Sequence, residues 1–197
     1  MVGSPQLQGS ALALSLPRLA RSAAGQESIA ALYREAVVLQ GPDASREALA
    51  GLGGPVDVLQ LDVHAVGTPS GPALVLAGEE GLLGTGDIGP QLLHGARLVV
   101  LGACATAAGP RDPLEGPMGL ARAFLGAGAG TVIATLWPVV DEDVSAILPR
   151  IHRHLAAGER PAAAFREALL EGIPAATDDG ALGDWAGLQL VSADAGS

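Results

Sequence analysis

Two side chains able to perform nucleophilic chemistry follow strand-like segments of this sequence. His64 comes directly after the apolar segment 56–63, and Cys104, the one cysteine of the chain, follows a second apolar segment that ends near residue 103. Because parallel strands present their carboxyl ends at one edge of a sheet, neighbouring strands would bring both side chains to the same edge. A thiol and an imidazole placed there form a nucleophile and its general base.

The chemistry expected of this pair is acyl transfer. The imidazole of His64 favours the thiolate of Cys104, which attacks a carbonyl, and the imidazolium then protonates the leaving amine. The backbone N–H groups of Cys104 and of Ala65, in an expected turn after His64, are candidate donors to an oxyanion. Asp62 shares the strand face of Gln60 and His64 and is a candidate for orienting the imidazole. A solvated carboxylate at the end of a strand is an equally good interpretation of Asp62.

A purely structural interpretation of both residues also exists. A lone cysteine is often a small buried hydrophobic residue, and a histidine after a strand often fills space and satisfies a hydrogen bond. The joint placement of Cys104 and His64 favours the catalytic pair.

Strand-like and helix-like segments alternate along the chain. Apolar, β-branched strands are expected at 36–39, 56–63, 73–77, 98–101, 131–136 and 185–191. Helices are expected at 28–35, 45–52 (capped by Asp43 or Ser45), 87–93, from Pro117, from Asp141 and from Pro161. Uniformly apolar strands alternating with helices indicate an α/β fold, a doubly wound and mostly parallel sheet with helices on both faces. We expect a single domain over residues 11–192, with loose termini at 1–10 and 193–197.

Composition excludes several classes of protein. With 49% hydrophobic and 16% charged residues among 197, the chain is not intrinsically disordered. A net charge of −10 disfavours binding to nucleic acid. The single cysteine excludes an intramolecular disulfide. The uncharged stretch 123–140 contains glycines and Pro138, so we expect a helix end, a turn and a strand there instead of a membrane span. We therefore expect a cytoplasmic protein.

No cofactor or metal is predicted. His152 and His154 lie two positions apart on an expected helix, on different faces, so they cannot share a metal ion. The glycines at 84, 86 and 89 match a dinucleotide-type pattern, but the strand and the acidic partner that such a site needs are missing. A turn is the better interpretation.

At its candidate catalytic residues the sequence resembles a known family. The segment 57–64 (DVLQLDVH) and the loop after it resemble the histidine segment of CHAT domains, and 98–106 (LVVLGACAT) resembles their cysteine segment. Segments 119–128, 132–139 and 185–190 extend the likeness, which covers residues 45–192 in order and spacing.

CHAT domains are caspase-like cysteine peptidases, related to separase and often fused to tetratricopeptide repeats. The resemblance implies a caspase-like fold, with His64 as base and Cys104 as nucleophile in peptide-bond hydrolysis. It also implies a protein or peptide substrate, and a repeat domain or activator protein as regulatory partner. The chain departs from the family pattern at three positions: Gln60 replaces a histidine, Ala65 a glycine, and Ala105 an acidic residue.

The sequence thus predicts a cysteine endopeptidase. Asp141 lies at the expected edge and is a candidate for selecting a basic substrate residue, although a helix cap is the stronger interpretation. One alternative is a catalytically weak or inactive CHAT-like domain that binds proteins or signals. An unrelated α/β hydrolase is the third hypothesis, and the absence of a Gly-X-Ser-X-Gly motif counts against its serine form.

Overall fold

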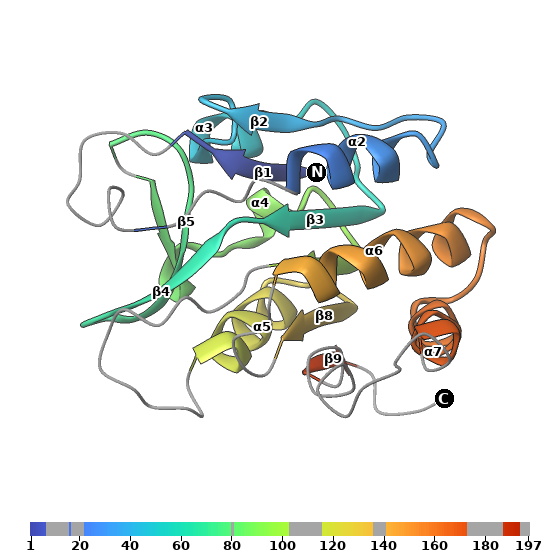
Figure 1. Ribbon diagram of the computed structural model, residues 1–197. Coiled ribbons are helices and arrows are strands. Elements are labelled where there is room, and N and C mark those ends of the chain that lie inside the picture. Colours follow the sequence, from blue (N-terminus) through green and yellow to red (C-terminus); the bar gives the residue numbers. More distant parts are fainter. Residues whose placement is uncertain are drawn as a thin grey trace.

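The computed structural model describes residues 1–6, 16, 22–79, 81–102, 116–135, 141–172 and 187–193 (Figure 1). For residues 22–24, 116–117 and 141–146, only the backbone is described.

A six-stranded sheet forms the centre of the fold, in the order β2-β1-β3-β7-β8-β9. Its strands are β1 (Val2–Pro5), β2 (Leu39–Gly41), β3 (Val58–Asp62), β7 (Leu98–Leu101), β8 (Thr131–Thr135) and β9 (Leu188–Ser192). All neighbouring pairs are parallel except β8 and β9. The predicted α/β fold with a mostly parallel sheet is confirmed.

Helices cover both faces of this sheet. One face carries α2 (Ser22–Ala30), α6 (Asp141–Ala156) and α7 (Pro161–Gly172), and the other carries α3 (Arg46–Ala50), α4 (Pro90–Leu93) and α5 (Gly116–Gly126). Because strand residues alternate between the faces, Leu59 and Leu61 pack with α3, α4 and α5, whereas Leu98 and Val100 pack with α2, α6 and α7.

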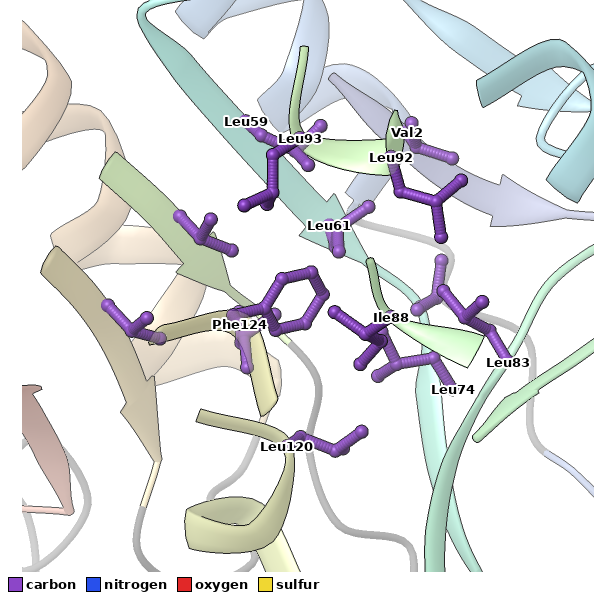
Figure 2. Packing of buried hydrophobic residues seen from close by; sticks show 14 of the residues in the cluster. Val2, Leu59, Leu61, Leu74, Leu83, Ile88, Leu92, Leu93, Leu120 and Phe124 are labelled. Carbon is purple, nitrogen blue, oxygen red and sulfur yellow. The ribbon is translucent and has the colours of Figure 1, made fainter. Parts of the chain in front are cut away.

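The larger core lies on the α3–α4–α5 face. Figure 2 shows the ring of Phe124, from α5, among leucines contributed by the strands and by other helices. Phe124 is 1% exposed, and its neighbours Leu61 and Leu120 are equally buried. Every member of this core cluster is apolar.

A smaller antiparallel sheet continues from the end of β3. It consists of β4 (His64–Thr68), β5 (Gly71–Val75) and β6 (Leu82–Gly84), followed by the short helix η1 (Thr85–Asp87). In Figure 1 the β4–β5 hairpin projects beyond the carboxyl end of β3. The hairpin turn is held by the Thr68 hydroxyl, which donates to the carbonyl of Gly71 over 2.7 Å.

Several expected elements are confirmed closely. β7 occupies the predicted residues 98–101, α7 begins at Pro161, and Ser45 caps α3 by accepting a hydrogen bond from the N–H of Ala48. The first helix, expected at 28–35, instead ends at Ala30. The first ten residues do not form a loose terminus throughout, because Val2–Pro5 is the strand β1, paired on both sides. Its place depends on backbone pairing, which its short polar sequence does not reveal.

The uncharged stretch 123–140 is divided as predicted over its described part. The helix α5 ends at Gly126, and the strand β8 begins at Thr131. Among the described residues, no helix has both the length and the apolar character needed to cross a membrane.

Candidate active site

The strands that precede His64 and Cys104 are immediate neighbours. β3 and β7 run parallel, and their register pairs Val58 with Leu98 and Leu61 with Leu101. The N–H of Gly102 extends this ladder by donating to the carbonyl of Leu61 over 3.0 Å. The condition on which the predicted pair depended, adjacent strands with a common carboxyl edge, is therefore met.

His64 has a different setting from the one predicted. It is the first residue of β4, paired with Val75, and only 2% of it is exposed. The turn expected after it is absent, because Ala65 lies within β4 opposite Leu74. The residues after His64 therefore continue as a strand, since the segment 71–75 folds back as their hairpin partner.

Ala65 stands where the family pattern has glycine, but it needs no left-handed backbone. Among the described non-glycine residues, positive φ angles occur at Ser4 and His94 and not at Ala65. The methyl group of Ala65 is buried, with 6% of the residue exposed. The extended backbone of this strand thus accepts an alanine without strain.

Two predicted site residues are described only in part or not at all. Cys104 is outside the described residues, which stop at Gly102 and resume at residue 116. Asp141 is the first residue of α6, the helix that it was predicted to cap, and its side chain is outside the described part.

Asp62 is a buried carboxylate at the carboxyl end of β3. It is 6% exposed, so the alternative of a solvated strand-end carboxylate is wrong. Its Oδ2 accepts hydrogen bonds from Gln60 Nε2 at 2.7 Å and from Gln26 Nε2 at 3.1 Å. Two amide donors within the core compensate for the loss of hydration that burial of a carboxylate entails.

One glycine on each side of β3 makes room for this carboxylate or for the Gln26 amide that donates to it. Gly3 of β1 pairs with Asp62, and Gly102 follows the last residue of β7 on the other side. A Cβ atom on Gly102 would overlap Asp62 Oδ1, and one on Gly3 would overlap the amide of Gln26. The side chains of Asp62 and Gln26 therefore occupy the space that a side chain at Gly102 or Gly3 would need.

The hydrogen bonds continue from Asp62 to helix α6. Gln60 Oε1 contacts His152 Nε2, and His152 Nδ1 lies 2.6 Å from the hydroxyl of Tyr33. On the other branch, Gln40 Nε2 donates to Gln26 Oε1 at 3.0 Å. We call this set the buried polar chain; it consists of Tyr33, His152, Gln60, Asp62, Gln26 and Gln40.

The protonation states of the titratable groups His152 and Tyr33 in the buried polar chain follow from their burial. Burial, and secondarily the positive charge of the terminal amino group, lowers the pKa of His152 to about 4, so its imidazole is neutral at pH 7. Burial raises the pKa of Tyr33 to about 12, which keeps its hydroxyl protonated. Because the amide nitrogen of Gln60 faces Asp62, its oxygen must accept from His152 Nε2–H. Tyr33 then donates to Nδ1.

Each of these donors points toward Asp62. The order runs from the Tyr33 hydroxyl to His152, from His152 to Gln60, and from Gln60 to the carboxylate. Hydrogen bonds aligned in one direction polarise one another. The result is a fixed carboxylate at the edge where the two candidate catalytic segments begin.

Sequence reasoning considered His152 and Gln60 but missed their connection. His152 lies four positions after Leu148 and three before Leu155, so it interrupts an apolar helical stripe. Gln60 likewise interrupts an apolar strand. A polar residue on each of two otherwise apolar faces was the available signal. His154 has different partners, because its imidazole binds the carboxylates of Glu159, in the turn before α7, and of Glu171, in α7.

Comparison with known families agrees with this architecture. The family described as CHAT domain matches residues 1–193 of the 197-residue chain. The match includes β1 and β2, beyond the segments that carried the resemblance. No curated protein matches the chain significantly. On this match over nearly its whole length, the chain belongs to the CHAT domain family, which is related to the caspase-like cysteine peptidases.

Proposed function

We propose that this protein is a cysteine endopeptidase that hydrolyses peptide bonds with Cys104 as nucleophile and His64 as base. The observation that carries the proposal is the register of β3 and β7. Leu61 and Leu101 are partners in neighbouring parallel strands, and His64 and Cys104 each follow three residues later. Each reactive residue is therefore equally far along the chain from a pair of residues at the same edge of the sheet, which supports the proposed pair.

The proposed reaction has two stages. His64 accepts the thiol proton, and Cys104 Sγ attacks the scissile carbonyl carbon to form a tetrahedral intermediate. The C–N bond then breaks as His64 returns the proton to the leaving amine, which leaves a thioester. Water, deprotonated by His64, hydrolyses the thioester, which releases the carboxylic acid and restores the thiol.

Other residues take supporting roles in this proposal. The N–H groups of Cys104 and Ala65 are the candidate donors to the oxyanion. Asp62 stabilises the imidazolium of His64, two residues along the chain. Asp141, at the start of α6, favours a basic residue in the substrate. We further propose a protein or peptide substrate in the cytoplasm and regulation by a tetratricopeptide-type domain or an activator protein.

The test is alkylation of Cys104 by iodoacetamide across pH, in the wild type and in His64→Ala. The chain has one cysteine, so the labelling rate reports this thiol alone. We expect the wild type to label with a midpoint well below pH 8.5, the approximate value of a free thiol, and His64→Ala to lose that shift. Equal midpoints in the two proteins, each near that of a free thiol, would refute the pair. A shifted midpoint justifies a peptide-library screen for the cleaved residue.

The second candidate function is a protein-binding or signalling module without turnover. The burial of His64 and the incorporation of Ala65 into β4 favour it, because a base must reach the substrate. In that case peptide libraries would show no cleavage by the wild type even where Cys104 is reactive. Binding without cleavage in the same screen separates the two functions.

A further inference from the structure

The buried polar chain lies on an otherwise apolar face and ends at the candidate site. Gln26, Gln60 and His152 are each no more than 1% exposed, although their neighbours on this face are leucine and isoleucine. Buried polar groups are expensive unless every member is hydrogen-bonded. A core built only for stability has no need of such a chain here, so its direction and its end are informative.

The buried polar chain ends beside the segment that carries the proposed nucleophile. Asp62 Oδ1 lies against the backbone of Gly102, two residues before Cys104, and Asp62 itself lies two residues before His64. The carboxylate therefore sits between the starts of both catalytic segments. A negative charge at this point favours the imidazolium of His64 and with it the thiolate–imidazolium form of the pair.

We infer that Tyr33, His152 and Gln60 are positioning residues of the proposed dyad, which act through Asp62 by holding its carboxylate against Gly102. This inference rests on the proposed function. The three residues do not touch the substrate. Their effect is to fix the carboxylate of Asp62, which lies between the starts of the two catalytic segments.

The geometry supports a positioning role at each step. The ring of Tyr33 meets that of His152 edge to face, with centroids 5.7 Å apart, which fixes the imidazole plane as well as its hydrogen bond. Gln60 then transmits this placement from α6 to β3. Gln26 of α2 donates to the same carboxylate, and Gln40 of β2 in turn donates to Gln26.

The charged and titratable groups around the chain are few among the described residues. The amino group of Met1 donates to the carbonyl of Val37 at 2.6 Å, and burial lowers its pKa while the charge of Asp62 opposes that change. Besides Asp62, the titratable members of the buried polar chain are Tyr33 and His152. Since both stay neutral at pH 7, the chain orients Asp62 without adding a charge of its own.

The test compares the pH midpoint of Cys104 labelling between the wild type and variants with substitutions in the buried polar chain. His152→Leu removes the donor to Gln60, and Tyr33→Phe removes only one hydroxyl. We expect both to raise the labelling midpoint, His152→Leu by at least about half a pH unit, which is about threefold less thiolate on the acid side. His152→Gln retains a side-chain N–H donor at this position. Compared with His152→Leu, it should therefore bring the Cys104 labelling midpoint much of the way back to the wild-type value.

His154→Leu is the matched control. It removes a histidine two positions along the same helix, whose partners are Glu159 and Glu171 and not Asp62. We expect its labelling midpoint to equal that of the wild type. Thermal unfolding of every variant separates a loss of stability from a change at the thiol, and Tyr33→Phe carries the test if His152→Leu does not fold.

The outcomes distinguish this inference from the proposed function. If wild type and His64→Ala label alike, the dyad is refuted and the inference falls with it. If the midpoint depends on His64 but is unchanged in folded Tyr33→Phe and His152→Leu, the dyad stands and the inference is overturned. If the buried polar chain served only stability, this second result would be found: the variants would melt at lower temperatures, and the labelling midpoint of Cys104 would be unchanged.

Discussion

The two faces of the six-stranded sheet are stabilised by different means. On the α3–α4–α5 face, Phe124 and the leucines around it form a continuous apolar cluster (Figure 2). On the α2–α6–α7 face, Ile147 and Ile151 form a second apolar cluster, but Gln60 and His152 run through the same layer as a hydrogen-bonded chain. Gln60 and His152 are as deeply buried as Phe124, each being 1% exposed, so exposure does not account for the difference.

The difference matters because the two kinds of packing impose different constraints. Apolar contacts are non-directional, and they tolerate exchange of residues of similar volume. A hydrogen-bonded chain fixes the orientation of each member and penalises the loss of any one of them. The apolar face therefore supplies stability, and the polar chain supplies orientation at one edge of the sheet.

The largest expected effect on stability comes from the apolar face. Phe124→Ala leaves a cavity in the centre of the larger cluster and should lower the free energy of unfolding by about 3–5 kcal/mol. Denaturant unfolding measures this loss. Phe165→Ala, the same change at a half-buried position of α7, should cost clearly less. If Phe165→Ala costs as much as Phe124→Ala, the assignment of stability to the first face is wrong.

The polar face should be the one that responds to acid. His152 has its pKa lowered by burial, from 6.5 to about 4, so the unfolded chain takes up the proton first. The stability that this histidine contributes is complete above pH 6.5 and is lost as pH falls to about 4. At about 1.4 kcal/mol per pH unit, the interval amounts to about 3 kcal/mol. Unfolding free energies at several pH values, compared between wild type and His152→Gln, measure it.

His154 provides the opposite sign as a control. The hydrogen bonds that the His154 imidazole donates to Glu159 and Glu171 raise its pKa, so its contribution is complete below its ordinary pKa of 6.5 and is lost as pH rises through the raised value. In His154→Gln the loss of stability between pH 6.5 and 4 should therefore persist. Should His152→Gln retain the acid sensitivity of the wild type, another group would be its source.

Local patterns in the sequence predicted the regular elements well. The run 98–101 is uniformly apolar and forms β7, and Pro161 opens α7 where its fixed φ and missing N–H cost nothing. Such features depend on residues close together in the sequence. The adjacency of β3 and β7, by contrast, was only a condition of the predicted pair, and the structure meets it.

Long-range features were not predictable in the same way. Tyr33 and His152 are 119 positions apart, and Gln60 and His152 are 92 apart, so no local window contains the polar chain. The strand β1 has four residues, two of them Gly3 and Pro5, and it exists because partners lie on both sides. The burial of Asp62 escaped prediction for the same reason, since it depends on strands and a helix that the sequence does not place.

The smallest effect concerns the space around Asp62. A Cβ on Gly102 would overlap Asp62 Oδ1 and would approach Leu148 Cδ1 to 3.3 Å, so Gly102→Ala should destabilise the fold by about 1–3 kcal/mol. Gly126→Ala is the matched control at the exposed end of α5, where a Cβ meets nothing within 4 Å. It should be neutral or stabilising by up to about 1 kcal/mol, because alanine restricts the unfolded chain.

A double-mutant cycle shows whether the carboxylate causes the cost at Gly102. In an Asp62→Ala background the oxygen that a new methyl group would strike is gone, so Gly102→Ala should cost less than in the wild type. The interaction energy, from denaturant unfolding of the four proteins, should be at least about 0.5 kcal/mol. An additive cycle would place the obstacle at Leu148 instead. In that case a glycine is needed at position 102 because α6 packs there, and not because of the Asp62 carboxylate that the buried polar chain holds in place.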